Sequence, residues 1–178
     1  EGIGAILLSV RFVQDFGWGK GIYYGIFHSV SAFCNAGFDL MGGLFTGGKI
    51  VENASSFSCA LTGDAFVSLT HYATDPLVSL TICALVIIGG LGFYVWGDLM
   101  DKKFNLKKAS LHTRIVLTMS GILLLFSTVL FMVFEWNNPE YAEKGYNFGE
   151  RLLVCFFNAT TPRTAGFNTS DMTSLSDS

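Results

Sequence analysis

The pattern of apolar and polar positions contains two stretches that are long enough to cross a lipid bilayer. Leu77–Gly97 and Ile115–Phe134 carry no charged residue, and a membrane-spanning helix needs about 20 apolar residues. The pattern therefore predicts two transmembrane helices, because a lone segment can satisfy its backbone in lipid only as a helix. The first of them contains the sequence GGLG at Gly89–Gly92. We explain it by close packing against a neighbouring helix, with a hinge as the alternative.

Three further apolar segments are too short to cross. We interpret Ile3–Val10 as the exit end of a span that begins before this sequence and is stopped by Arg11. The helical part of the next segment, about Ile22–Cys34, would be roughly 20 Å long, against a hydrocarbon core of ~30 Å. Phe148–Thr161 is a second segment of this kind. We expect both to be half-crossing helices, each followed by a loop that returns to the side it came from.

The two half-crossing segments are copies of one pattern. FHSVSAFCNAGFD, Phe27–Asp39, aligns without a gap with FFNATTPRTAGFN, Phe156–Asn168. Four aligned positions are identical and two are conservatively matched: Phe27/Phe156, Ala36/Ala165, Gly37/Gly166, Phe38/Phe167, Ser31/Thr160 and Asp39/Asn168. Self-similarity at a long spacing indicates two copies of one supersecondary unit.

Composition agrees with an all-α integral membrane protein. Hydrophobic residues make up 51% of the chain and charged residues 14%, whereas soluble domains carry about 25% charged residues. The net charge of −3, without a basic patch, gives no indication of a nucleic-acid partner. The four cysteines lack metal-ligand spacing, and no nucleophile with a base appears. We therefore expect neither an enzyme nor a covalent cofactor.

Lysine and arginine are distributed unevenly among the connecting loops. Asp98–Arg114 holds five of the eleven basic residues, whereas loops 41–76 and 135–147 hold one each. The bias places Asp98–Arg114 in the cytoplasm and the other two loops outside. Both half-crossing segments are then entered from the external side. We assign no task to the long outer loop 41–76.

Each half-crossing helix leads into an Ala-Gly-Phe loop, at Ala36–Phe38 and Ala165–Phe167. The C-terminal end of a helix carries partial negative charge, which favours a cation. Glycine permits the positive φ angles that turn carbonyl oxygens inward, and rings of such carbonyls form cation filters. The aromatic residue would act as a wedge that holds the loop. The pattern predicts two strands of a filter; for either copy alone, an ordinary helix C-cap is the alternative.

These motifs carry a family resemblance. SAFCNAGFDL and TTPRTAGFNT resemble the second and third filter motifs of the Trk/Ktr/HKT superfamily of potassium transporters, and LHTRIVL at Leu111–Leu117 is similar to the Ktr membrane subunit. The resemblance implies helix–pore loop–helix units of the potassium-channel-like type, four of them around one pore, in a bacterial cytoplasmic membrane. About one and a half to two units would be present in this interior fragment. It implies potassium uptake, with sodium possible, through filter carbonyls of Asn35, Ala36, Gly37, Phe38, Thr164, Ala165, Gly166 and Phe167.

The resemblance also orders the chain and implies partners. Residues 1–97 would be the second unit, with pore helix and filter at 15–40, the outer loop at 41–76 and a second helix at 77–97. A basic cytoplasmic loop at 98–114 would lead to a truncated third unit at 115–178. The implied partners are the lipid bilayer, a second copy in a homodimer, and a cytosolic nucleotide-binding ring. The basic loop would contact that ring or anionic headgroups, or serve only to set the topology.

Three residues near the filter are expected to support it or to lie at its outer mouth, and His28 lies in the predicted helix before the first loop. Arg163 would point behind the filter as a paired brace, with direct gating as the alternative. Asp39 and Asn168 would lie at the outer mouth, where a carboxylate concentrates cations, although Asp39 could be merely solvated. We interpret His28 as a hydrogen-bonded packing residue, with a ligand or a pH sensor as the alternative. Two other functions stay open: a secondary transporter of another fold with broken helices that bind a small solute, and a non-conducting membrane scaffold.

Overall fold

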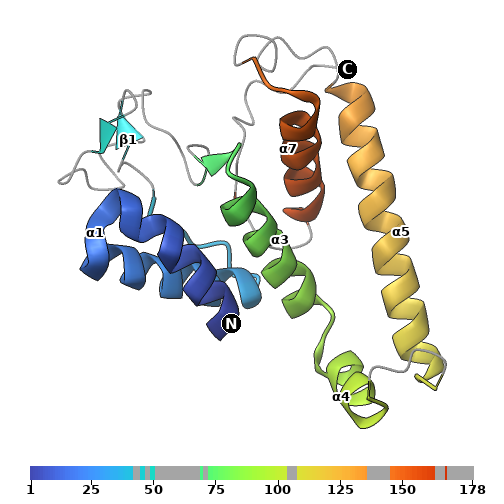
Figure 1. Cartoon of the computed structure of the whole chain (residues 1–178). Coiled ribbons are helices and arrows are strands. Elements are labelled where there is room, and N and C mark those ends of the chain that lie inside the picture. The colour runs from blue at the N-terminus through green and yellow to red at the C-terminus, as the bar shows by residue number, and fades with distance from the viewer. Residues whose placement is uncertain are drawn as a thin grey trace.

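The computed structural model describes residues 1–41, 69, 72–103, 108–135, 145–162 and 167, and the backbone of two short strands. The described elements are α1 (Gly2–Phe33), β1 (Phe45–Thr46), β2 (Lys49–Ile50), α3 (Pro76–Gly90), α4 (Phe93–Asp101), α5 (Leu111–Phe134) and α7 (Phe148–Thr160). β1 and β2 pair antiparallel and form one small hairpin with two residues in each strand. Apart from this hairpin, the all-α expectation holds for the described residues. α3 lies between α1 and α7, and α5 forms the outer edge beyond α7 (Figure 1).

Helix α1 consists of two helical halves, residues 2–16 and 18–33, and the second half folds back along the first. Gly17 has φ 76° and ψ 172° at the kink, a conformation that is costly for a residue with a Cβ. Beyond the kink the halves touch backbone to backbone. A Cβ on Gly25 would lie 2.2 Å from Ser9 Oγ, and one on Gly21 would lie 2.5 Å from Val13 Cα. The GxxxG spacing thus serves here as a close-packing surface within one chain.

Arg11, where we expect the first apolar segment to stop, is not the end of the helix. The helix continues through Arg11 to the kink at Gly17. The charge is accommodated because Arg11 bonds Asp15, one turn later on the same helix, and Asp75 at the start of α3. The second half of α1 is about 24 Å long at 1.5 Å per residue, which still falls short of a ~30 Å hydrocarbon core.

The segment predicted as a span over Leu77–Gly97 is not one straight helix, although its two parts together are long and apolar enough to form one broken span. The segment is two helices, α3 and α4, whose axes differ by 88°. The break follows Leu91, at Gly92, whose φ of 82° is outside the helical region. Close packing, the first explanation of the GGLG sequence, is confirmed at Gly89, and the chain also bends within this sequence, although a static bend does not test a hinge. Gly89 packs closely, since a Cβ there would lie 1.9 Å from the Phe33 carbonyl oxygen, and the chain bends three residues later.

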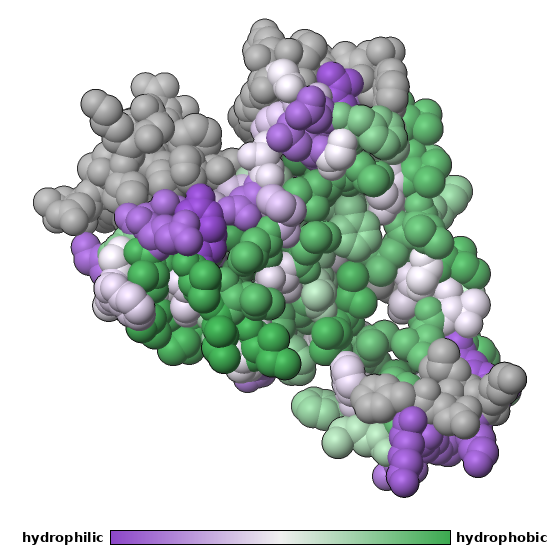
Figure 2. Space-filling model, viewed as in Figure 1, coloured by the Kyte–Doolittle hydropathy of each residue, from purple (hydrophilic) through white to green (hydrophobic). Residues whose placement is uncertain are grey.

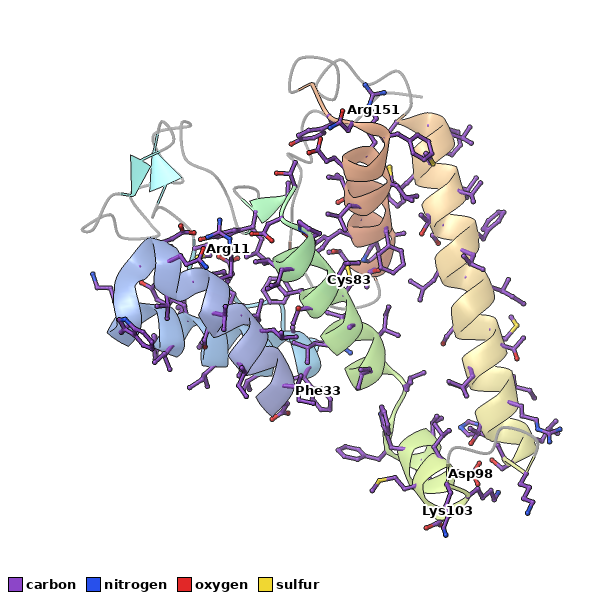
Figure 3. The ribbon with its side chains drawn as sticks, viewed as in Figure 1. Arg11, Phe33, Cys83, Asp98, Lys103 and Arg151 are labelled. Carbon is purple, nitrogen blue, oxygen red and sulfur yellow. The ribbon has the colours of Figure 1, made fainter. Side chains whose placement is uncertain are left out.

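Helix α5 is the one described helix that is long and apolar enough to cross a membrane unaided. Most of its large apolar side chains are exposed, as expected of a lipid-facing surface. Hydrophilic residues gather in two regions, over the upper ends of α1, α3 and α7 and at the α4–α5 corner, with a hydrophobic band between them (Figure 2). Arg11 and Arg151 lie toward the first region, and Asp98 and Lys103 lie at the second (Figure 3).

The α4–α5 corner is fixed by hydrogen bonds to one carboxylate. Asp98 accepts from the backbone N–H of Ser110 at 2.7 Å and also pairs with Lys102. Ser110 in turn caps α5, because its Oγ accepts from the backbone N–H of Thr113 at 3.3 Å. α5 begins at Leu111 and α4 ends at Asp101, so the connection is shorter than the loop 98–114 expected from charge alone.

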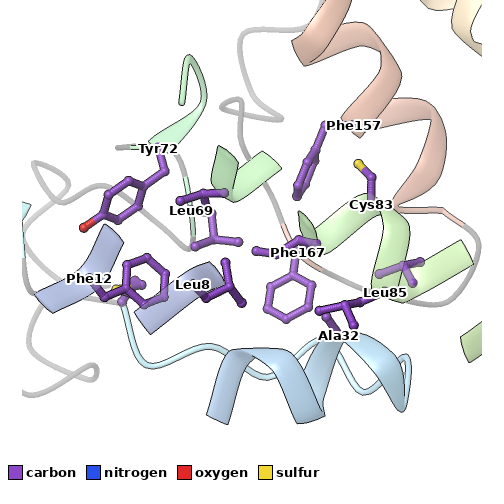
Figure 4. Packing of buried hydrophobic residues seen from close by; sticks show 13 residues of the cluster. Leu8, Phe12, Ala32, Leu69, Tyr72, Cys83, Leu85, Phe157 and Phe167 are labelled. Carbon is purple, nitrogen blue, oxygen red and sulfur yellow. The ribbon is translucent and has the colours of Figure 1, made fainter. Parts of the chain in front are cut away.

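A hydrophobic core joins the two copies of the repeat. It contains Leu8 and Phe12 from the first half of α1, Ala32 from the second half, side chains of α3, and Phe157 from α7. Phe167, from the second Ala-Gly-Phe sequence, lies in the middle of this cluster (Figure 4). Helix α7 begins at the end of the molecule where α5 ends (Figure 1). At the start of α7 the Glu150 carboxylate accepts a hydrogen bond from the Asn147 N–H at 2.8 Å.

Candidate ion-coordinating loops

The first candidate loop follows directly on the end of α1. The N–H of Asn35 donates to the carbonyl of Ala32 at 3.2 Å, and the N–H of Ala36 donates to that of Ser31 at 2.9 Å. These two bonds form a Schellman motif, with Asn35 at φ 52° in its left-handed position. The C-cap interpretation therefore applies to Asn35. Gly37 is a second residue of positive φ, at 71°, which the cap does not require.

Two side chains of α1 hold this loop from behind. Ser31 Oγ donates to the Phe38 carbonyl oxygen at 2.7 Å. The backbone N–H of Leu40 donates to His28 Nε2 at 3.3 Å, while His28 Nδ1 lies 2.7 Å from the carbonyl of Tyr24. Since a carbonyl can only accept, the proton belongs on Nδ1 and the ring is a neutral imidazole. His28 is completely buried, which agrees with its interpretation as a hydrogen-bonded packing residue.

The two residues after Gly37, Phe38 and Asp39, make hydrogen bonds that fix the end of the loop. Of the four predicted filter carbonyls, that of Phe38 accepts the hydrogen bond from Ser31. The other three candidates are the carbonyls of Asn35, Ala36 and Gly37. Asp39 Oδ1 accepts from the N–H of Met41 at 3.1 Å, which turns the chain as it leaves the loop.

Of the second candidate loop, the structure describes Phe167. Arg163, Thr164, Ala165, Gly166 and Asn168 lie outside the described residues, so their predicted roles stay predictions. Phe167 is completely buried, and its ring centroid lies 6.3 Å from that of His28. It packs as the expected wedge and brings the end of the second loop against the helix that carries the first.

The aligned Phe38 behaves differently, because 70% of its surface is exposed. Phe167 is thus packed as a wedge would be and Phe38 is not, while the role of either ring in holding its loop stays a prediction. Phe167 packs among residues of α1, α3 and α7, whereas no described residue covers Phe38 in this way.

A polar cluster that sequence reasoning missed links α1 to α3. Arg11 Nε donates to Asp75 Oδ2 at 2.5 Å, and Arg11 Nη1 donates to Asp15 Oδ2 at 2.9 Å. The Tyr72 hydroxyl donates to the same Asp15 oxygen at 2.7 Å. Asp75 also caps α3 by accepting from its first backbone N–H groups. Burial, followed by the hydrogen bond to Asp15, raises the pKa of the Tyr72 hydroxyl well above its usual value, which keeps it a donor.

Two sequence signals could have revealed part of this cluster. Arg11 and Asp15 have the i, i+4 spacing of a helical ion pair, and Asp75 before Pro76 is a typical helix start. The pairing of Arg11 with Asp75 spans 64 residues and had no local signal. Among the residues that the structure describes, no group of three or more His, Cys, Asp or Glu side chains could hold a metal ion.

A family model described as TrkH, cation transport protein, matches residues 58–178, more than half of the chain. The chain belongs to this family. The resemblance inferred from the Ala-Gly-Phe motifs is thereby confirmed at the level of the family, and the family is one of cation transport proteins rather than enzymes. Its long apolar helix and bent helix pair agree with a helical membrane protein.

Several bacterial relatives in the TrkH family are similar over nearly the whole chain. The potassium/sodium uptake protein NtpJ of Enterococcus hirae is 39% identical over 174 residues, 98% of this chain and 33% of that protein. The Ktr system potassium uptake protein B of Vibrio alginolyticus is 39% identical over 176 residues, 97% of this chain and 33% of that protein. Its counterpart in Bacillus subtilis is 37% identical over 178 residues. The chain spans about a third of the length of each.

Proposed function

We propose that this TrkH-family chain is part of a potassium uptake subunit, and that backbone carbonyls of its two Ala-Gly-Phe loops coordinate the ion. The carbonyls are those of Asn35, Ala36 and Gly37 in the first loop and of Thr164–Phe167 in the second. The observation that carries the proposal is the first loop itself. A helix too short to cross ends in two residues of positive φ, Asn35 and Gly37, with His28 and Ser31 bonded to the loop from behind.

Electrostatics favours a cation at this point. The last carbonyls of a helix carry about half an elementary negative charge, and this charge is screened little where lipid and protein exclude water. Residues 18–33 end at the loop, so the negative end of their helix dipole lies beside the proposed ion-coordinating carbonyls. Coordination by carbonyls needs no proton transfer and no covalent step. Sodium stays possible as a second transported ion, since one relative is named a potassium/sodium uptake protein.

We also propose the topology that the charge distribution predicts. The α4–α5 corner, with Asp98 and Lys103, would face the cytoplasm, and the end that carries Arg11 and Arg151 would face outward. The hydrophobic band between two polar regions supports a position in the bilayer between these two ends, and the lysine and arginine bias supports the choice of the cytoplasmic end (Figures 2 and 3). Both short helices then enter from outside. Two relatives are named as proteins of a Ktr system, which supports the proposal that this chain works with further components of such a system. A second copy in a homodimer and a cytosolic nucleotide-binding ring are the components that we propose.

The test uses the full-length protein in its own membrane or in proteoliposomes. Gly37→Ser and Gly166→Ser add a side chain where the loop needs glycine, and Gly37 has a φ of 71° at which such a side chain is strained. We expect each to lower the ratio of potassium to sodium uptake. Gly97→Ser is the matched control, because a Cβ on Gly97 in α4 would meet no atom within 4 Å. A ratio that survived both loop substitutions would show the filter assignment to be wrong.

A further inference from the structure

The first Ala-Gly-Phe loop is seated on the broken end of α3. The Phe33 carbonyl oxygen, at the end of α1, approaches Gly89 so closely that a Cβ there would lie 1.9 Å away. One residue beyond Cys34, the Asn35 side chain reaches the same turn of α3. Oriented so that both its groups are satisfied, its carboxamide NH₂ donates to the carbonyls of Val86 and Ala32 at 3.2 Å each, and its oxygen accepts from the N–H of Gly90 at 3.3 Å.

The two α3 groups that Asn35 contacts are a helical hydrogen-bonding pair. An α-helix joins the carbonyl of residue i to the N–H of residue i+4, which here means Val86 and Gly90. The carboxamide therefore docks on the last such step of α3, and side chains inserted beside this ladder are a recognised cause of kinks. The break follows at once, at Leu91 and Gly92.

A second side chain closes the bend from the other side. Trp96, in the first turn of α4, donates from its indole N–H to the carbonyl of Ile88 at 3.0 Å. A cavity of about 470 Å³ lies beside this junction, lined by Asn35, the last residues of α3 and Ser120 of α5. The bend is thus held by specific hydrogen bonds, and a cavity lies beside it.

We propose that the Asn35 side chain is a positioning residue that couples the first ion-coordinating loop to the bend between α3 and α4. The backbone of Asn35 is part of the loop, and its carboxamide is hydrogen-bonded to the end of α3 at the bend. A change in the angle between α3 and α4 would therefore shift the side chain, and with it the carbonyls of Asn35 and Ala36. This inference rests on the proposed function of the loop. It assigns the side chain a role that the filter prediction, which concerned the backbone alone, did not contain.

Two substitutions of Asn35 separate its side chain from its backbone conformation. Asn35→Gly keeps the positive φ without strain but removes the carboxamide. Asn35→Asp keeps the size and tolerates the left-handed conformation, but replaces the NH₂ donor by an oxygen that faces the Val86 carbonyl. Both are made in the full-length protein after its native cysteines are replaced. That background includes a substitution of the adjacent Cys34 with Asn35 intact, and it serves as the matched control.

Two quantities are measured on each variant. The angle of the bend is followed by the distance between spin labels at Leu80 on α3 and Met100 on α4, both of which are more than half exposed. Ion selectivity is followed by the ratio of potassium to sodium uptake. We expect both Asn35 variants to shift or broaden the distance distribution and to lower the ratio about two- to tenfold, the scale of one net hydrogen bond. Trp96→Phe should shift the distance in the same direction.

The outcomes decide the proposal separately from the function on which it rests. An unchanged distance distribution in both Asn35 variants overturns the coupling, whatever the uptake ratio does, and an unchanged ratio overturns it as well. If Gly37→Ser and Gly166→Ser also leave the ratio unchanged, the filter assignment itself has failed. Should the Asn35 variants not fold, Gly90→Ala tests the same contact, because its methyl group would lie 3.3 Å from the carboxamide. Wild-type behaviour of Gly90→Ala in both measurements would then overturn the proposal.

Discussion

Gly89→Ala probes the seat of the first loop with the smallest possible change. The added methyl group would lie 1.9 Å from the Phe33 carbonyl oxygen and 2.8 Å from its carbonyl carbon. Ordinary contacts begin near 3.4 Å, so the end of α1 would have to retreat by about 1.5 Å. The atoms that would have to move are backbone, which cannot rotate away as a side chain can. Overpacking of this kind costs about 1–3 kcal/mol.

The same substitution elsewhere supplies the control. Gly121 lies inside α5, and a Cβ there would meet no atom within 4 Å. Gly121→Ala should stabilise the helix by about 0.5–1 kcal/mol, because alanine loses less backbone entropy on folding than glycine does. The propensity gain is shared by both substitutions, so the difference between them isolates the clash. The two variants should therefore differ by about 1–3 kcal/mol in free energy of unfolding.

The assay is thermal unfolding of the full-length protein in detergent, with the midpoint temperature as the readout. We expect the order Gly89→Ala below wild type, and Gly121→Ala at or above wild type. A midpoint for Gly89→Ala equal to that of Gly121→Ala would refute the close approach of α1 to α3, and with it the seat of the loop.

Substitutions at three further positions test other contacts. Gly25→Ala should lower the midpoint by a similar amount, since its Cβ would lie 2.2 Å from Ser9 Oγ, whereas Gly19→Ala meets nothing within 4 Å and should not. His28→Phe keeps an aromatic ring in the core but leaves the Leu40 N–H without its acceptor; we expect a loss of about 1–3 kcal/mol and reduced potassium uptake. Asp75→Asn retains an N-cap acceptor for Leu77 but loses the charge paired with Arg11, so it should cost at most about 1 kcal/mol. Asp75→Ala should cost about 1 kcal/mol more, and equal midpoints for the two Asp75 variants would show that the cap contributes nothing.

Local pattern predicted the elements whose cause is local. The uncharged run that ends at Phe134 became α5, and the short run from Phe148 became α7. The length of the uncharged helix before Asn35 correctly separated it from a full span. The repeat was also informative, because each copy has the same local pattern of a short apolar segment followed by an Ala-Gly-Phe sequence. Family membership could be read from the Ala-Gly-Phe motifs alone.

Features with a distant cause could not be predicted. The run of apolar residues from Leu77 looks continuous, yet α3 ends where Asn35 docks on it, some fifty residues away in sequence. Arg11 looked like a helix end because its partner Asp75 is 64 residues away. Phe38 and Phe167 occupy equivalent positions in the repeat but differ in burial, since a neighbouring surface and not the residue type decides whether an aromatic ring is covered.

The most direct test of the proposed filter is to locate the ion. A structure of the full-length protein with rubidium or thallium in place of potassium would give anomalous density wherever the ion binds. We predict density in contact with the carbonyl oxygens of Ala36 and Gly37 and with those of the Thr164–Phe167 loop. Density at the loops that is lost in Gly37→Ser would support the filter, whereas an ion bound elsewhere in a transport-competent protein, with none at these carbonyls, would contradict it.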